Sequence, residues 1–413
     1  MKFDTIIIGG GLTALTAGIS LAKHQKRVAV IGDGQSTMHF NSGSLDLLGY
    51  DDEGKEVVNP IDAINDLPKE HPYHKVTDIK ASTEEAKQLL EDAGLGLQGN
   101  ASMNHYRLSP IGETAPTWLT INDMVLLNGK KLPWNNIILA NIEGFLDFQV
   151  NFLKPALEKL GANVTVRIFT TPKLEYARQS PSEFRATNIA KYLDDENNVK
   201  EVAEKLNAMG KADVILLPAV LGIANDNAIE QLKKNTRLPI AFLATMHPSV
   251  PGVRIATLLR RKFQALGGEH FQSDIVTGGE IMDGRVKYIS THNMVEEHLE
   301  ADNFILATGS FLSRGLQSNY QEVWEPIFHV DVKSATERKD WHNDQFFTDQ
   351  AFMSFGVKTD DKLHAIKEGK PIANLYAAGS ILADNDYLKY SDHEGVDMLT
   401  ALQVSHLVLG DRY

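Results

Sequence analysis

The sequence predicts an α/β fold that is built on a parallel sheet and is discontinuous along the chain. Residues 3–8 form an apolar run, three glycines follow, and 12–23 has a helical pattern. A second β-rich run at 27–31 completes a strand–turn–helix–strand unit. Two more apolar runs, 302–308 and 374–378, end in glycine turns near the C-terminus. We expect these distant strands to return to the first unit.

The middle of the chain predicts an inserted domain. A helix is expected to open at 82–85, before this domain. Within it, a strand, a helix and two further strands are expected at 137–140, 145–160, 163–169 and 214–218.

Prolines at 248 and 251 then interrupt the chain. Beyond them we expect a helix over 253–266, a strand at 285–289 and a last helix over 396–409. The predicted domains are a nucleotide (flavin)-binding domain, 1–109 with 251–413, and a cap or substrate domain, 110–250.

Composition excludes several classes of function. The 413 residues carry a formal charge of -13, which opposes nucleic-acid binding. The chain has no cysteine, so its own thiolates cannot hold an iron–sulfur cluster or a zinc ion. Asp4 and the glycines argue against a secretory signal, and no apolar run is long enough to span a membrane.

The first glycine turn has the spacing of a nucleotide site. Gly9, Gly10 and Gly11 lead to Ala14 in a G-x-G-x-x-A pattern between strand and helix. Gly9 permits the tight turn, Gly11 lets backbone N–H groups approach a phosphate, and Ala14 lets the helix lie close to the strand. The prediction is therefore a Rossmann-like FAD/NAD(P)-binding fold of the flavoprotein type with an inserted cap domain. The C-terminal turns add these candidate cofactor residues: Thr308, Gly309, Gly379 and Ser380.

An acid that would hold an adenosine ribose is displaced from its expected place. Gly32 ends the second strand, and Asp33 follows one residue late. Asp33 either bends back to bind the ribose or is a solvated turn residue. A cofactor without adenosine, namely FMN, would not require this acid.

The chain resembles the B-subunit family of anaerobic glycerol-3-phosphate dehydrogenase from the N-terminus to about Ala383. The resemblance rests on the glycine turn and on these segments: 34–36, 39–48, His71-Pro72-Tyr73, 183–190 and 248–254. It implies an FMN-binding subunit, with FAD as the alternative, and adds Ser42, Gly43 and Ser44 to the expected cofactor contacts.

The resemblance also implies partners and a location. A protein of this kind pairs with an FAD-containing A subunit to oxidise sn-glycerol 3-phosphate to dihydroxyacetone phosphate, in anaerobic respiration and glycerol metabolism. Electrons pass to a membrane-associated iron–sulfur C subunit, which delivers them to quinone. The expected location is cytoplasmic, at the inner face of the cell membrane through a partner subunit.

Such an oxidation needs a base for the hydroxyl proton and cations for the phosphate. The candidates are His39, His247, Arg185 and Arg254, of which His39 precedes the serine–glycine turn and His247 lies at the proline-rich junction. Each could instead be an ordinary structural residue.

The remaining histidines indicate no further site. We interpret His105 as a surface residue. We expect no metal site, because the histidines show only one close pair, His71 and His74, in a loop-like context.

One segment departs from the family pattern. Where better-known members have a glycine-rich turn, residues 384–396 contain several acids and one glycine. Because acids repel a flavin phosphate, this change leaves a second hypothesis, a structural or electron-relay subunit with a decayed flavin site. A third hypothesis is a stand-alone FAD-dependent reductase of the fumarate-reductase type.

Overall fold

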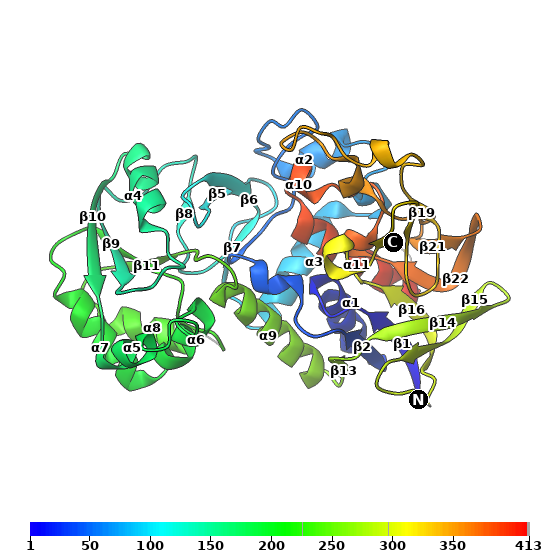
Figure 1. The fold of residues 1–413 in the computed structure, drawn as a ribbon, viewed down its shortest axis with the longest axis horizontal. Coiled ribbons are helices and arrows are strands. Elements are labelled where there is room, and N and C mark those ends of the chain that lie inside the picture. Colours follow the sequence, from blue (N-terminus) through cyan, green and yellow to red (C-terminus); the bar gives the residue numbers. More distant parts are fainter. Residues whose placement is uncertain (225, 296, 411–413) are drawn as a thin grey trace. The chain divides into compact units, whose positions relative to one another are not determined.

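The computed structural model describes residues 1–224, 226–295 and 297–410. The chain divides into two compact units (Figure 1). The first unit contains Met1–Thr37, Asp46–Ala93 and the described residues from Leu259 onward. The second unit contains Met38–Leu45 and Gly94–Leu258.

A six-stranded sheet organises the first unit, in the order β13-β2-β1-β16-β22-β21. Its strands are β13 (Glu269–Gln272), β2 (Val28–Gly32), β1 (Lys2–Ile8), β16 (Glu300–Leu306), β22 (Lys370–Ala377) and β21 (His364–Lys367). All neighbours pair in parallel except β21 and β22. The central strands are buried on both faces, which explains their continuous apolar runs. The N- and C-terminal parts of the chain thus share one sheet, as predicted.

Three helices of this unit pack against one another: α1 (Leu12–Lys23), α3 (Ile79–Asp92) and α11 (His393–Leu409). The helix α3 begins three residues before the expected Ser82, because the Asp78 side chain accepts a hydrogen bond from the Ala81 N–H at 2.9 Å and caps the helix. Every residue of α11 from Gly395 to His406 is buried. A hairpin of β14 (Val276–Met282) and β15 (Arg285–Thr291) completes the larger elements.

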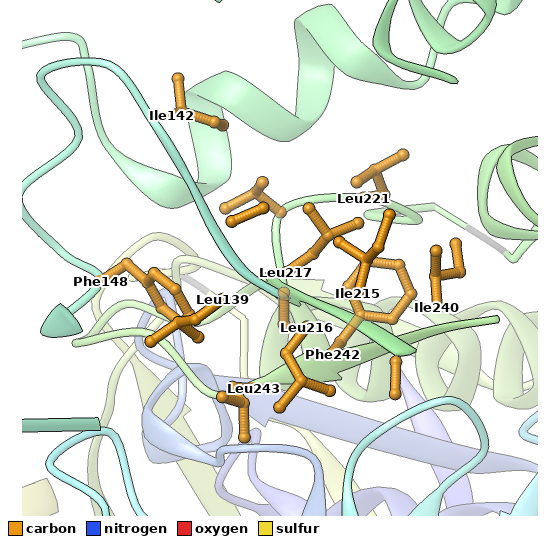
Figure 2. Close-up of a cluster of buried hydrophobic side chains, with 14 of the residues drawn as sticks. Leu139, Ile142, Phe148, Ile215, Leu216, Leu217, Leu221, Ile240, Phe242 and Leu243 are labelled. Atoms are coloured by element: carbon orange, nitrogen blue, oxygen red, sulfur yellow. The ribbon is translucent and has the colours of Figure 1, made fainter. Parts of the chain in front are cut away.

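The second unit has its own four-stranded parallel sheet, in the order β10-β9-β11-β12. The strands are β10 (Asn163–Phe169), β9 (Asn136–Ile142), β11 (Val214–Pro218) and β12 (Ile240–Leu243). Figure 2 shows the core of this unit, in which Leu139, Leu216 and Phe242 pack with other apolar side chains. The helices are α4 (Val150–Lys159), α5 (Pro172–Arg178), α6 (Ala186–Leu193), α7 (Glu196–Asn207) and α8 (Asn227–Asn235).

Two small antiparallel sheets also belong to the second unit, β3-β7-β4 and β6-β5-β8. Their strands are β3 (Ser44–Leu45), β7 (Leu119–Ile121), β4 (Leu97–Gln98), β6 (Thr114–Thr117), β5 (His105–Leu108) and β8 (Leu126–Leu127). The remaining α-helices are α2 (Pro60–Ala63), α9 (Val250–Ala265) and α10 (Tyr387–Tyr390), and the remaining strands are β17 (Gln317–Ser318), β18 (Val323–Trp324), β19 (Val332–Lys333) and β20 (Gly356–Val357).

The compact units differ in extent from the domains expected from sequence. Residues 94–109 and the short segment 38–45 pack within the second unit, because β3, β4 and β5 pair with strands of that unit. The helix expected over 145–160 begins only at Val150, after local turns. Among the described residues, no helix is both long and apolar enough to cross a membrane.

Candidate functional site

The glycine turn after β1 is closed by its neighbours in the sheet. Gly9 has φ +128°, and a Cβ at this position would lie 2.0 Å from the Ala307 carbonyl oxygen. A Cβ on Gly32 would lie 2.9 Å from Gly10 Cα. The carboxyl ends of β1, β2 and β16 therefore approach so closely that Gly9 and Gly32 have no room for a side chain.

Gly11 differs from Gly9 because its surroundings are open. Apart from Gly11 and its two chain neighbours, no described residue has an atom within 4 Å of a Cβ built on Gly11. No side chain among the described residues caps α1, of which Gly11 is the N-cap residue. Ala14 is fully buried, as its role in close packing requires. The start of α1 thus offers N–H groups toward open space, which fits the phosphate of a nucleotide.

The turn after β16 adds a polar atom at the same edge of the sheet. Thr308 Oγ1 is buried and has no hydrogen-bond partner among the described residues. Gly309 has φ +73° and permits the chain to turn back, so that a Cβ on Gly315 would lie 1.8 Å from the Gly309 carbonyl oxygen. A buried hydroxyl without a partner is the kind of group that a bound ligand satisfies.

The turn after β22 is held by α11. Gly379 has φ +75°, and its N–H donates to Thr400 Oγ1 at 2.8 Å. The N–H and hydroxyl of Ser380 both donate to Asp397 Oδ1, at 3.0 and 2.8 Å. A Cβ on Gly379 would lie 2.2 Å from Thr13 Oγ1, in the first turn of α1. The structure thus brings Gly379 and Ser380 next to the first glycine turn.

Asp33, the displaced acid, forms an ion pair with Arg314. Asp33 follows β2, and Arg314 lies in the loop after β16, in the left-handed backbone conformation with φ 63°. Their side chains are 42% and 71% exposed. Sequence reasoning missed Arg314, because 281 residues separate the partners and no local pattern marks a loop arginine.

In the second unit, the serine–glycine segment is tied to the start of α9. The Ser249 N–H donates to the His39 carbonyl at 2.9 Å, and the Ser249 hydroxyl donates to the Asn41 carbonyl. Asn41 Oδ1 accepts from the Gly43 N–H at 2.8 Å, and Gly43 has φ +94°. Ser42 is half-buried.

Ser44 belongs to a short polar chain inside the second unit. Its hydroxyl lies 3.2 Å from Thr120 Oγ1, which lies 2.7 Å from His105 Nε2. Ser44 and His105 are both buried. The interpretation of His105 as a surface residue is therefore wrong, because strand β5 turns its side chain toward β7.

His247 and Arg185 lie together in the second unit. Arg185 Nη2 donates to the His247 carbonyl at 3.3 Å, and Arg185 Nε lies 3.0 Å from Asp147 Oδ2. The His247 ring meets Phe40 edge-on, with centroids 5.5 Å apart. Burial lowers the pKa of His247. Burial raises the pKa of Asp147, and Arg185 opposes that rise.

Arg254 lies in a different environment from the other candidates. Arg254 is 5% exposed, and its Nε has no hydrogen-bond partner among the described residues. Burial lowers its pKa, and the charges of Asp226, Asp123 and Asp194 oppose that effect. Asp194 also accepts hydrogen bonds from the N–H groups of Gly222 and Ile223. The charges of three acids thus act on this buried guanidinium, which does not face an open surface.

The near pair His71 and His74 has two separate structural roles. His71 Nε2 lies 2.9 Å from Asp392 Oδ2, and both side chains are buried. His74 Nε2 lies 3.0 Å from the Leu67 carbonyl. No group of three or more metal-binding side chains gathers within the described part of the chain.

Comparison with known proteins places these features in a family. Residues 4–395 match the FAD binding domain family. The B subunit of anaerobic glycerol-3-phosphate dehydrogenase from Yersinia pestis bv. Antiqua (strain Antiqua) is 38% identical over 420 residues, covering 100% of this chain and 99% of that protein. The protein of the same name from Yersinia enterocolitica serotype O:8 / biotype 1B is 39% identical over 418 residues, covering 99% of this chain and 98% of that protein.

Among solved structures, 3-ketosteroid delta1-dehydrogenase from Sterolibacterium denitrificans aligns over 100% of both chains at 9% identity, with a TM-score of 0.46. The full-length matches confirm the resemblance seen in the sequence, and the FAD binding domain match confirms the predicted fold class. The chain belongs to the B-subunit family of anaerobic glycerol-3-phosphate dehydrogenase.

Proposed function

We propose that this chain is the flavin-binding subunit of an anaerobic glycerol-3-phosphate dehydrogenase, a complex that oxidises sn-glycerol 3-phosphate to dihydroxyacetone phosphate. The observation that carries the proposal is the match over the whole chain to proteins of that name. The open start of α1 and the buried Thr308 hydroxyl support it, because both fit a bound nucleotide.

FMN is the proposed flavin, with FAD as the alternative. Gly32 stands where a ribose-binding acid is expected, and Asp33 is engaged by Arg314. FMN has no adenosine, so it needs no ribose-binding acid at either position. In this proposal the phosphate binds at Gly10 and Gly11. The other proposed cofactor contacts are Thr308, Gly309, Gly379, Ser380, Ser42, Gly43 and Ser44.

The proposed base and cation are His247 and Arg185. Because burial lowers the pKa of His247, its imidazole is neutral near pH 7 and can accept the hydroxyl proton. Arg185, which is 47% exposed, can meet a phosphate while Asp147 holds its Nε. When bound, the flavin accepts the hydride. His39 remains a second candidate base, and the acids around Arg254 favour a structural role for that residue.

Partner proteins would carry the remaining steps. The chain has no cysteine, so iron–sulfur clusters must belong to another protein of the complex. We propose two partners, an FAD-containing subunit, and a membrane-associated iron–sulfur subunit that passes electrons to quinone. The chain would then lie in the cytoplasm at the inner face of the membrane, held there by its partner.

A second candidate is a relay or scaffold subunit without flavin. It is favoured by the acids Asp392 and Glu394 at the start of α11, because acids repel anionic groups such as a flavin phosphate. Flavin content separates the two candidates.

The experiment that tests the proposal is an absorbance titration of the purified chain with FMN, FAD and riboflavin. We expect saturable binding of FMN, and bleaching by glycerol 3-phosphate once the FAD-containing partner is added. The matched variant is Gly11→Ala, which we expect to bind FMN more weakly than wild type. Absence of binding by either flavin nucleotide, with that partner present, would overturn the flavoprotein proposal and leave the scaffold.

A further inference from the structure

The acidic segment 384–396 places a histidine among acids at the start of α11. His393 Nε2 lies 3.7 Å from Asp397 Oδ2, and the two side chains are 33% and 10% exposed. Asp397 accordingly heads the set of acids whose charges act on this ring, followed by Glu394, Asp392 and Asp46.

These acids are themselves held by hydrogen bonds. Asp392 contacts His71, a Glu394 carboxylate oxygen accepts from the Asp46 N–H at 3.1 Å, and Asp46 Oδ2 accepts from the Ser391 hydroxyl at 2.9 Å. Burial lowers the pKa of His393, but the surrounding carboxylates outweigh it and raise the pKa overall. The acidic segment therefore favours a protonated imidazole in its centre.

Contacts connect this imidazole to two of the glycine turns, the one after β1 and the one after β22. Asp397, its nearest acid, accepts both hydrogen bonds from Ser380. The Cβ of an alanine at Gly379 would lie 2.6 Å from Asp397 Oδ1 and 2.2 Å from Thr13 Oγ1. A continuous series of contacts therefore connects α1 to His393 through Gly379 and Asp397.

A stacked tyrosine connects the imidazole to the glycine turn after β16. Tyr387 stacks on the His393 ring with centroids 4.8 Å apart and planes 29° apart. Burial raises the pKa of Tyr387, and the nearby Ser310 side chain, one residue after Gly309, opposes that rise. The stacked pair thus reaches the carboxyl ends of β16 and β22, where ligands of open α/β sheets bind.

We propose that the His393 imidazolium, held by Asp397 and stacked on Tyr387, is the positive charge that this chain sets against the reduced, anionic form of its flavin. The proposal rests on the proposed function and deepens it. Reduction places negative charge on the flavin ring, which the acids of α11 alone would oppose.

The test compares the affinities of the purified chain for oxidised and for reduced FMN, measured anaerobically by titration and by equilibration with redox dyes. In His393→Gln we expect oxidised FMN to bind within about twofold of wild type and reduced FMN about tenfold more weakly, since a charge interaction of one pKa unit is tenfold. That change lowers the midpoint potential by about 30 mV. His364→Gln is the control, because His364 also pairs with an acid, Asp360, and packs on Tyr376.

A second variant separates charge from packing. Asp397→Asn keeps the Oδ1 acceptor for Ser380 but removes the charge beside His393. Loss of this charge lowers the pKa of His393, so we expect the affinity ratio of this variant to fall from that of wild type toward that of His393→Gln as the pH is raised. Equal weakening of both flavin forms in His393→Gln, or a pH-independent ratio in Asp397→Asn, would overturn the inference. If the wild-type chain binds no flavin, the proposed function itself is wrong. If it binds flavin but His393→Gln weakens both forms equally, only the inference about His393 is wrong.

Discussion

At the scale of single residues, the glycines of the first turn separate into two kinds. A methyl group on Gly9 would collide with the Ala307 carbonyl at 2.0 Å, in a backbone conformation that disfavours any side chain. A methyl group on Gly11 would enter open space. The two positions therefore serve folding and binding separately.

We expect Gly9→Ala to destabilise the chain by about 3 kcal/mol or more, through strain and collision. Gly11→Ala should keep the wild-type unfolding midpoint and weaken FMN at least tenfold, because its methyl group blocks the approach to α1. Urea unfolding and flavin titration of both variants measure these effects. If Gly11→Ala binds FMN with wild-type affinity, the flavin phosphate does not bind at the start of α1.

The pair Arg185 and Asp147 gives a pH-dependent prediction. Arg185→Gln leaves the Asp147 carboxylate, 9% exposed, without its cation. We expect a loss of about 2 kcal/mol at pH 8, below that of a fully buried pair because Arg185 is half-exposed.

The loss should shrink as the pH falls. Burial already raises the pKa of Asp147, and removal of Arg185 raises it further. The stability linked to protonated Asp147 is present below its ordinary pKa of 3.8 and is lost as the pH rises through its folded-state pKa. Urea unfolding at pH 5 and pH 8 measures the difference, and Arg185→Gln combined with Asp147→Asn is the control. An equal loss at both pH values would contradict this account.

At the scale of elements, the start of α11 is fitted to a buried tyrosine. Tyr73 donates a hydrogen bond to the Leu47 carbonyl at 2.5 Å, and a Cβ on Gly395 would lie 2.1 Å from the Tyr73 hydroxyl oxygen. The one glycine kept in the acidic segment is therefore required by packing.

We expect Gly395→Ala to cost about 2 kcal/mol through overpacking. Tyr73→Phe removes the colliding oxygen, so the double variant should be more stable than the sum of the single losses predicts. Thermal and urea unfolding of the four proteins gives the coupling energy. If the losses in unfolding free energy simply add, the methyl group of Gly395→Ala is accommodated by a shift that does not involve the Tyr73 hydroxyl.

The sequence predicted regular elements better than it predicted contacts between them. The helix 12–23 is found at Leu12–Lys23, because a glycine turn and a basic last residue mark both ends. The role of Asp33 could not be predicted, since its partner Arg314 lies in a distant loop. The burial of His105 also depends on strand pairing, which a single strand does not reveal.

At the scale of the whole molecule, the proposed flavin contacts of the first unit come from three distant parts of the sequence. The turns at Gly9–Gly11, Thr308–Gly309 and Gly379–Ser380 follow β1, β16 and β22, which are neighbours in one sheet. A ligand at this edge should therefore protect three separate segments at once.

Hydrogen exchange of the chain with and without FMN tests this expectation. We expect slower exchange at the start of α1, in the loop after β16 and at Gly379–Ile381, because bound ligand suppresses local opening. The helices α7 and α8, which belong to the second unit, should exchange as before and serve as an internal control. At 100 times the dissociation constant, FMN should also stabilise the folded chain by about 2.7 kcal/mol. Protection of only one of the three segments would show that the sheet edge does not act as a single site.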